Sequence, residues 1–521
     1  MVDSVKQPGR LRPAPENFLS EEQIKAVGAG RRDFLRKSFL AAGAALAALE
    51  ARLREDLSRL ELPARRWTVP RQHGGQPVAD VVIVGAGMAG LTAAAALKFL
   101  GIEAVLLDRA PAGFEGPWAT TARMETLRSP KQLTGPALGM ASLTFRAWFE
   151  ACFGAAAWAE LDKIDRLHWM EYLRWYRRVL ELPVRNGHTV QAIEPQADRR
   201  VVLRVAHAGK VFELAASRVV LATGRDGLGS PWVPDFARTI PRTRWAHSAD
   251  LMDYRTLRGQ RVAVVGGGSS AMDVAATALE AGAASVDLLV RRADLPRINK
   301  GKGAGSPGMT HGYQDLPDAW KWRIRHYLNR QQTPPPHGST LRVSRHPNAR
   351  FHLGCPVLEA GEHQGALHLR TPKGICVADF VLFSTGFRMN FDARPEFAAL
   401  APHLRLWGDR YQAAPGEADD ELSELPDLGP VFEFTEKSPG ACPGLSRVHC
   451  FCYPAVLSHG AVTGDIPAIS EGAQRLAQGL ASLLFRENIE AHFAAMERYA
   501  DPELLGDEWQ PSDSSHFLPL S

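Results

Sequence analysis

Two segments of this 521-residue chain repeat the same order of features, and the repetition limits the fold more than any other property of the sequence. Residues 78–110 and 260–292 each hold an apolar, Val-rich run, a glycine-rich loop, an Ala-rich run and a second apolar run. The short apolar runs predict buried strands, and the Ala-rich runs predict helices. We therefore expect an α/β fold with two Rossmann-like dinucleotide-binding domains.

In the first segment, the predicted strand at residues 80–84 leads into Gly85, Gly87 and Gly90, with the spacing G-x-G-x-x-G. The first glycine permits a sharp turn, the second leaves room for a diphosphate, and the third lets the helix pack closely on the strand. The start of the following helix offers free N–H groups to that diphosphate. Asp108, 23 residues after Gly85, ends the next strand and is predicted to accept hydrogen bonds from an adenosine ribose.

The second segment carries Gly266 and Gly268, with Ala271 at the third glycine position, a replacement that the pattern tolerates. Its closing strand ends in Arg291 and Arg292 instead of an acid. A second dinucleotide is therefore expected here.

The opposite charges at the ends of these two strands distinguish the two ligands. A carboxylate repels a 2′-phosphate, whereas a guanidinium fork matches phosphate oxygens. We therefore predict FAD, with its plain ribose, at the first loop and NADPH at the second. The alternative, that Arg291 and Arg292 are only solvated strand-end residues, stays open.

Two dinucleotides in one chain indicate hydride transfer from a nicotinamide to a flavin. Thr223 and Gly224 end a strand just before the second segment, and Thr385-Gly386 repeats the pattern just after it. Asp465 precedes a predicted helix whose N-terminus is expected to face the flavin. The NADPH domain is thus predicted to be inserted in a discontinuous FAD domain.

This reading divides the chain into five parts. They are an N-terminal segment (1–54), a linker (55–79), the FAD domain (80–257 and 375–475), the NADPH domain (258–374) and a C-terminal helix with a tail (476–521). Residues 303–350 interrupt the NADPH domain, where a lid or a substrate-facing element is expected.

On these motifs the chain resembles the two-dinucleotide-binding flavoproteins and, within them, the NADPH-dependent flavin monooxygenases: the flavin-containing, Baeyer–Villiger and N-hydroxylating enzymes. Gly116-Pro117-Trp118 is similar to the Gly-Gly-x-Trp loop of that family, and residues 124–136 stand where its members contact the flavin ring. The resemblance implies that NADPH reduces FAD, and that a flavin C4a-peroxide formed with O2 then inserts one oxygen atom into a small-molecule substrate.

The chain departs from the family at the fingerprint F-x-G-x-x-x-H, because Pro241 and Thr243 occupy the Phe and Gly positions. His247 is retained, and the resemblance implies that it orients the nicotinamide. Leu251 stands where the Baeyer–Villiger form has Trp, which argues against oxygen insertion beside a ketone. His247 and Arg128 are the candidate catalytic residues. Arg225 is also expected near the cofactors.

Two alternatives remain at this stage: a quinone-type reductase that inserts no oxygen, and a flavin-binding redox partner without turnover. Disulfide reduction is disfavoured, because the six cysteines form no C-x-x-C pair and only Cys450 and Cys452 lie close in sequence. No metal site is predicted. An amine, a thioether, a ketone and an aromatic ring all remain open as substrates.

Composition excludes other classes. The net charge of +4 comes without a long basic run, so nucleic acid is not an expected partner. No apolar run reaches the ~18 residues that span a bilayer. Arg31 and Arg32 begin a stretch that resembles a twin-arginine export leader, although a surface helix explains it equally well. NADPH use favours the bacterial cytoplasm, so localisation stays open, as does a homo-oligomeric state.

Overall fold

The computed structural model describes residues 43–225, 227–513, 515–518 and 520. Its largest sheet has the order β4-β3-β2-β7-β6-β5, with β1 beside β2 and β18 beside β7. The strands are β1 (Arg71–His73), β2 (Gln76–Val84), β3 (Ala104–Asp108), β4 (Val184–Asn186), β5 (Thr189–Pro195), β6 (Val201–His207), β7 (Lys210–Leu221) and β18 (Val448–Cys450). Strands β4, β3, β2, β7 and β18 run parallel, as the Val-rich runs predict.

The second sheet is wholly parallel, in the order β12-β11-β10-β16-β9. Its strands are β9 (Trp245–His247), β10 (Arg261–Val265), β11 (Ser285–Leu289), β12 (Ala349–His352) and β16 (Phe380–Phe383). It lies in sequence between β7 and β18 of the first sheet, which confirms the inserted second nucleotide fold. The strand pairing places β9 and β16 in the second sheet, whereas the sequence analysis put residues 245–257 and 375–383 in the first unit.

Small side chains set the distance between helices and the first sheet. Helix α2 (Met88–Phe99) buries the run Ala93–Ala96 against the sheet, and α14 (Ile469–Glu487) packs on α2. In the second unit, α6 (Ser269–Glu280) and α10 (His337–Ser344) pack together in the same way. Apolar area removed from water at these contacts is the main source of their stability.

An aromatic layer extends the first core on one side. It is formed by α3 (Phe145–Phe153), α4 (Ala155–Glu160) and α5 (Arg166–Val179). Trp169, Leu173, Tyr176 and Leu180 lie on one side of this layer and are buried in the first core. Tyr172, which donates a hydrogen bond to the Leu143 carbonyl at 2.7 Å, satisfies its hydroxyl within this layer.

The described part of the N-terminal segment packs on the same layer. Residues 43–59 are helical, and Leu49 and Leu53 are buried in the first core. Glu50 accepts a hydrogen bond from Arg178 of α5 at 2.5 Å. The twin arginine lies outside the described residues. The stretch predicted as a linker at 55–79 contains the end of this helix, β1 and the start of β2.

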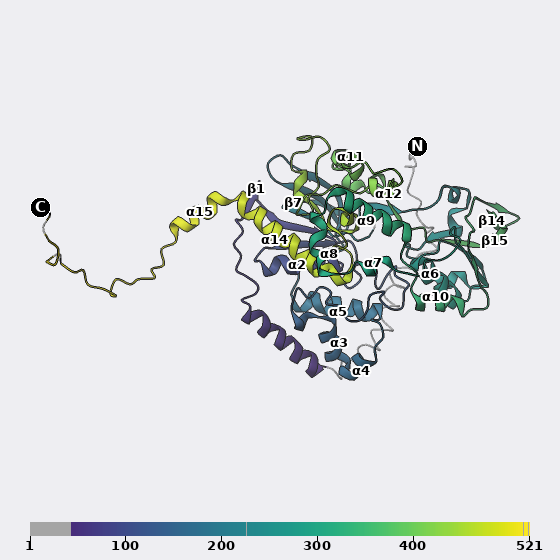
Figure 1. Cartoon of the computed structure of the whole chain (residues 1–521), viewed down its shortest axis with the longest axis horizontal. Coiled ribbons are helices and arrows are strands. Elements are labelled where there is room, and N and C mark those ends of the chain that lie inside the picture. The colour runs from purple at the N-terminus through teal and green to yellow at the C-terminus, as the bar shows by residue number, and fades with distance from the viewer. Residues whose placement is uncertain (1–42, 226, 514, 519, 521) are drawn as a thin grey trace.

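The segment between β11 and β12 forms α7 (Lys300–Gly303), α8 (Pro307–Gly312), α9 (Asp318–Gln331) and α10. Figure 1 shows α9 reaching away from the second unit toward α11 (Trp407–Arg410) and α12 (Asp420–Ser423). Two small antiparallel sheets complete the fold. One joins β13 (Glu359–His363), β14 (Ala366–Thr371) and β15 (Gly374–Ala378), and the other pairs β8 (Gly229–Pro231) with β17 (Phe387–Met389).

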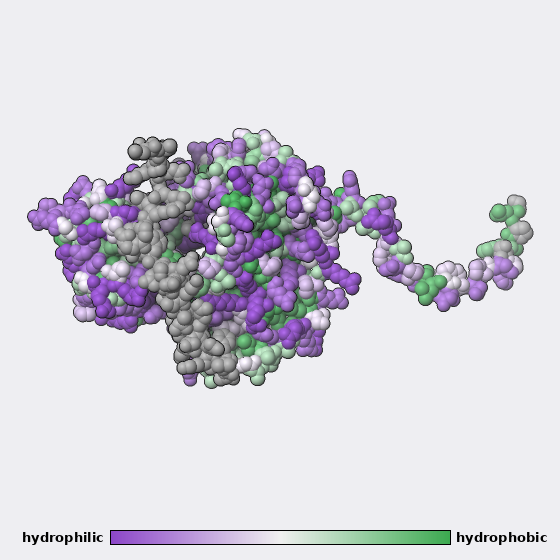
Figure 2. Space-filling view, turned by 180° about the vertical axis from the view of Figure 1, so that it is seen from behind, coloured by the Kyte–Doolittle hydropathy of each residue, from purple (hydrophilic) through white to green (hydrophobic). Residues whose placement is uncertain are grey.

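The C-terminal helix is interrupted at Asn488, and α15 (Ile489–Arg498) has no buried residue. The chain beyond it projects from the body in Figure 1, and Figure 2 shows both hydrophilic and hydrophobic residues along it. Leu504 and Leu505 in this stretch are exposed. Within the described residues, no helix has both the length and the apolar character that crossing a bilayer requires.

Candidate active site

The first glycine loop is built so that side chains are excluded from it. Gly85 has φ +102°, and a Cβ added there would lie 2.4 Å from the Ala222 carbonyl oxygen. A Cβ on Gly90 would lie 1.9 Å from the carbonyl oxygen of Gly85. Both positions therefore require glycine, one for its backbone conformation and both for the close approach of backbone atoms.

Asp108 ties the end of β3 to this loop. Its carboxylate accepts hydrogen bonds from the Ala86 and Ala110 N–H groups, both at 2.7 Å, and the residue is 9% exposed. Helix α2 begins after Gly87 without a side-chain cap and without an acidic residue in its first turn. Its N–H groups are thus left for an anion, which is the arrangement that a dinucleotide diphosphate needs.

The second glycine loop has the same turn but a more open mouth. Gly266 has φ +138°, and a Cβ there would lie 2.5 Å from the Ser384 carbonyl oxygen, whereas a Cβ on Gly268 would meet nothing within 4 Å. Ala271 occupies the position in this loop that Gly90 occupies in the first loop, and it is fully buried. Helix α6 begins after Gly268, again without a side-chain cap or an acidic first turn.

The two arginines at the end of β11 differ in their surroundings. Arg291 is exposed and, among the described residues, has neither a hydrogen bond nor an ion pair. Arg292 is half-buried and donates to the Arg330 carbonyl oxygen of α9 at 3.0 Å. The guanidinium of Arg291 is therefore free for a ligand. Arg292 instead contacts the segment α7–α10 between β11 and β12, which we call the helical excursion.

The linker after β7 runs beside the first loop. Gly224 has φ +91°, and its carbonyl accepts a hydrogen bond from the Tyr453 N–H at 3.3 Å. Thr223 donates its hydroxyl hydrogen to the Gly227 carbonyl at 3.2 Å. On the other side, the Cα of Gly116 lies 3.7 Å from the point where a Cβ of Gly87 would stand. Three segments far apart in sequence thus meet at the first glycine loop, and we call the site that they form the first cradle.

Asp465 stands just before α14, as predicted, and is accessible to solvent. Desolvation by the surrounding protein nevertheless raises the pKa of its carboxyl group. Ser470 donates to the Gly135 carbonyl at 2.6 Å and accepts from the Leu138 N–H at 2.9 Å. These bonds join the predicted flavin-facing loop to α14.

Arg128 connects the two nucleotide units. Its Nη2 lies 3.3 Å from Oδ2 of Asp273 on α6, and the other oxygen of Asp273 accepts from Ser339 at 2.8 Å. The side chain of Arg128 is 42% exposed, and desolvation by the surrounding protein nevertheless lowers its pKa. Asp273 was missed by the sequence analysis, although an acid inside an Ala-rich buried helix was a visible signal.

His247 ends β9 and is 2% exposed. Burial lowers its pKa to about 4, so the imidazole is neutral at physiological pH. Its Nδ1 accepts from the Ala249 N–H at 3.1 Å, and the ring packs edge-on against Phe387, with centroids 5.6 Å apart. The backbone N–H of His247 donates to Asp250 at 2.7 Å. Its Nε2 is buried and has no hydrogen-bond partner among the described residues.

A pocket opens at Arg225, the residue that follows Gly224 of the linker. It is lined by Arg225, Leu228, Gly229, Arg325, Asn329, Phe387, Arg388, Met389, Glu421, Leu422, Glu424, Leu425, Tyr453, Pro454 and Val456. The sequence analysis expected Arg225 near the cofactors and a substrate-facing element in residues 303–350. The pocket brings Arg225 together with Arg325 and Asn329 of α9, which belong to that element.

Taken together, the two loops fit two dinucleotides. Each offers a helix N-terminus without a side-chain cap, and each has a glycine turn that admits no Cβ where backbones meet. Asp108 stands at the first loop and Arg291 at the second, the pair of charges that the sequence predicts.

Comparison with known proteins supports the same class. The family model described as L-lysine 6-monooxygenase/L-ornithine 5-monooxygenase matches residues 156–327, and one described as FAD-NAD(P)-binding matches residues 82–226. The chain is 41% identical over 471 residues to an FAD-dependent urate hydroxylase of Xanthomonas campestris, an alignment that covers 90% of this chain and 99% of that protein.

Solved structures share the fold at lower identity. An ornithine hydroxylase from Pseudomonas aeruginosa superposes with a TM-score of 0.61 at 17% identity, covering 78% of this chain and 100% of that one. An ornithine N-hydroxylase from Kutzneria gives 0.59 at 17% identity, with coverage of 78% and 100%.

The chain belongs to the class B flavin monooxygenase family, with two dinucleotide-binding domains. The enzyme is an FAD-dependent monooxygenase that also binds a nicotinamide dinucleotide, and its homology to a hydroxylase sets aside both the reductase and the non-catalytic alternatives. The individual roles predicted for His247, Arg128, Asp465 and the loop residues stay predictions.

Proposed function

We propose that this enzyme uses NADPH and O2 to hydroxylate urate or a closely similar substrate, a planar and anionic nitrogen heterocycle. The observation that carries the proposal is the 41% identity to the urate hydroxylase, which extends over 90% of this chain and 99% of that protein. An alignment of this extent includes both glycine loops and the helical excursion, so a shared substrate class is its simplest explanation.

NADPH as the reductant is supported by Arg291. Its guanidinium is exposed at the end of β11 and is free of ion pairs within the described chain. A hydrogen bond to a charged partner is worth about 1.5–3 kcal/mol, which corresponds to a preference for the 2′-phosphate of roughly 10- to 150-fold. Asp108 occupies the matching strand end of the first unit, where a carboxylate suits a ribose with free hydroxyls.

In this proposal the side chains and helix N-termini bind the two cofactors, orient them and exclude water from the site. The two helix N-termini hold the diphosphates, and Asp465 holds the ribityl chain. His247 acts on the nicotinamide side as a positioning residue, because it is buried and neutral. FAD, when bound, supplies the redox chemistry with O2 that side chains cannot perform.

The family model over residues 156–327 favours a second candidate, N-hydroxylation of an amino acid side chain. An amine substrate and a urate-like substrate differ in charge and in shape, so one experiment separates them.

The test measures NADPH oxidation, O2 uptake and product in parallel, with purified FAD-loaded enzyme and either urate, L-ornithine or L-lysine. We expect urate to stimulate NADPH oxidation and to disappear in proportion to the O2 consumed, and NADH to serve as a poorer reductant. Stoichiometric hydroxylation of ornithine or lysine, with no turnover of urate, would replace the proposal with the second candidate. Equal use of NADH and NADPH would remove the role of Arg291.

A further inference from the structure

The pocket beside Gly224 carries more positive charge than its own carboxylates neutralise. Three arginines and two glutamates line it. Arg388 lies 3.6 Å from both Glu421 and Glu424, so these three side chains form one group. Arg225 and Arg325 form no ion pair within the described chain, and Nε of Arg325 is buried without a hydrogen-bond partner there. Such a surplus favours an anionic ligand.

Aromatic rings give the same pocket a flat surface. The guanidinium carbon of Arg225 lies 4.7 Å from the centroid of the Tyr453 ring and 5.8 Å from that of Phe387. A planar guanidinium held beside aromatic faces presents its N–H edge in a fixed direction. A flat ring with carbonyl oxygens along its rim can accept hydrogen bonds from this edge while it stacks on the rings.

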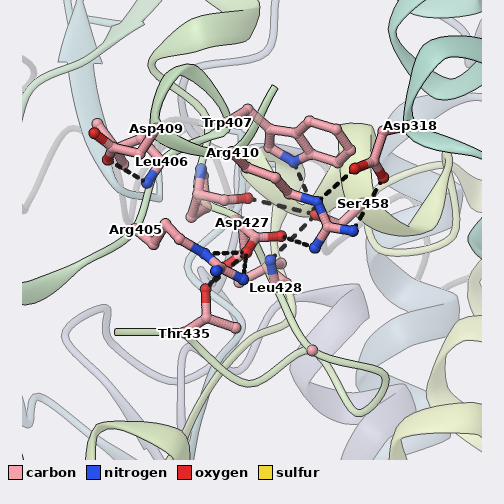
Figure 3. A network of polar contacts seen from close by, with 12 residues as sticks. Asp318, Arg405, Leu406, Trp407, Asp409, Arg410, Asp427, Leu428, Thr435 and Ser458 are labelled. Carbon is pink, nitrogen blue, oxygen red and sulfur yellow. Dashed lines mark hydrogen bonds and ion pairs between the residues drawn. The ribbon is translucent and has the colours of Figure 1, made fainter. Parts of the chain in front are cut away.

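The wall that carries Arg325 and Asn329 is held rigidly. Figure 3 shows the network at its base, where Arg410 makes two hydrogen bonds to Asp318 at the start of α9, at 2.8 and 3.1 Å. The same guanidinium donates to Asp427 at 2.9 Å, and the side chain of Asp427 is only 1% exposed.

Two further contacts complete this support. Arg405 donates its Nε–H to Asp427 at 2.7 Å, so a buried carboxylate is neutralised by two arginines. Farther along α9, Trp322 donates to the Glu417 carbonyl at 2.7 Å. A binding group set on a rigid helix loses little entropy when its ligand arrives.

The pocket lies near the ion pair that joins the two nucleotide units. Arg225 directly follows Gly224 of the linker beside the first cradle. It is also close enough to Arg128 for the two positive charges to repel, and this repulsion contributes to the lowered pKa of Arg128. A ligand in the pocket would therefore lie next to the groups that face the cofactors.

We propose that this pocket is the substrate site, and that Arg225, Arg325 and the Tyr453–Phe387 surface select a planar, anionic heterocycle rich in ring carbonyls. The inference rests on the proposed function and deepens it, because it assigns recognition to residues that no motif of the chain contains. Asn329 supplies a further amide beside the two guanidiniums.

The test uses the FAD-loaded full chain with Arg325→Met and Arg225→Met variants. Arg323→Met is the matched control, because Arg323 lies on the same helix but pairs with Glu417 at 2.9 Å and does not line the pocket. Binding of urate to the oxidised enzyme is followed by the change in flavin absorbance, with caffeine as an uncharged planar probe and L-ornithine as an amine probe.

We expect Arg325→Met and Arg225→Met to weaken urate binding at least 10-fold, with flavin content and the KM for NADPH unchanged. Caffeine binding should change little, and Arg325→Lys should recover part of the urate affinity. Loss of flavin in both variants would assign the arginines to cofactor binding and overturn the proposal.

Failure of the pocket and failure of the proposed function give different results. If the native enzyme hydroxylates urate and both variants bind it normally, the pocket assignment is wrong while the function stands. If urate binds in an Arg325-dependent way but is not hydroxylated, the function is wrong while the pocket stands. Selective loss of ornithine binding in the variants would contradict the anionic ligand class.

Discussion

The two glycine loops have the same order of strand, glycine turn and helix. They differ in whether the charged side chain at the strand end already has hydrogen-bond partners within the protein. In the first, Asp108 is buried and bonded to two backbone N–H groups of neighbouring turns. In the second, the corresponding Arg291 is exposed without a partner in the described chain, and the space at Gly268 is open.

This difference is the one expected between a resident and an exchanging cofactor. A cradle closed by its own hydrogen bonds suits a ligand that stays bound through many turnovers. A cradle with a free guanidinium and an open mouth suits a ligand that must arrive and leave. We therefore predict that the same local pattern of strand, glycine loop and helix binds a resident cofactor in the first unit and an exchanging one in the second.

The largest effect should come from closing the first cradle. Gly90→Ala would place a Cβ 1.9 Å from the Gly85 carbonyl oxygen, so the loop must shift or the domain must unfold. We expect the protein to be purified with little flavin and a lowered Tm. Gly268→Ala is the matched control, since its Cβ meets nothing within 4 Å, and it should keep its flavin. Equal flavin content in the two variants would contradict the claim that the first cradle is the tighter one.

Acid should act on both units through buried histidines. His247 of the second sheet has its pKa lowered to about 4, and His449 on β18 of the first sheet has its pKa lowered to about 3, both chiefly by burial. A folded pKa below the unfolded value near 6.5 means that stability is full above pH 6.5 and falls as the pH drops toward 4.

For His247 the loss by pH 4 is about 3 kcal/mol, at ~1.4 kcal/mol per pKa unit. Burial raises the pKa of Asp250 to about 6, so its protonation increases the free energy of unfolding as the pH falls below about 6. Because the His247→Asn variant keeps Asp250, the difference between this variant and the native enzyme reports the histidine. The free energy of unfolding of His247→Asn should therefore fall less between pH 6.5 and 4 than that of the native enzyme. Parallel pH curves would sink this account.

Exchange at the second cradle should depend on Arg291. Arg291→Ala removes the free guanidinium, so we expect the KM for NADPH to rise roughly 10- to 100-fold while that for NADH changes little. Arg297→Ala is the control, because Arg297 is exposed in the same stretch but pairs with Asp294 at 3.3 Å. A uniform rise for both nucleotides would show that Arg291 reads something other than the 2′-phosphate.

The smallest effect concerns the bridge between the cradles. Arg128→Gln removes the ion pair with Asp273, which is partly screened because Arg128 is 42% exposed. We expect a loss of about 1 kcal/mol in the free energy of unfolding, measured by urea denaturation, and a modest rise in O2 uptake that yields no product. Ser339→Ala is the control, because it removes a hydrogen bond to Asp273 but keeps the ion pair with Arg128. If this variant also wastes as much O2 as Arg128→Gln, the effect depends on the position of Asp273 and not on the guanidinium.

The sequence predicted what depends on local pattern. The strand predicted at residues 80–84 lies within β2, and each glycine turn follows its strand. Asp108 could be placed because the spacing of the motif fixes it. Residues brought together by the tertiary fold could not be placed. The Arg128–Asp273 pair joins positions 145 residues apart, and nothing local to either marks the other.

The same limit explains the remaining differences. Whether residues 245–247 pair with β7 or with β16 depends on which sheet edge is free, and a three-residue strand carries no record of its partner. The burial of His247 follows from that pairing and from the packing of Phe387, so the sequence alone could not predict it. The pocket combines residues from Arg225 to Val456 for the same reason.

The helical excursion between β11 and β12 has a mechanical consequence. It grows out of one nucleotide unit and is fastened to the other, by Asp318 on Arg410 and by the Thr310 carbonyl, which accepts from Arg475 of α14 at 2.9 Å. A hinge rotation of the two units as rigid bodies would have to break these two contacts in every catalytic cycle. We therefore expect nucleotide and substrate to enter and leave by movements of loops and side chains that keep these contacts in place.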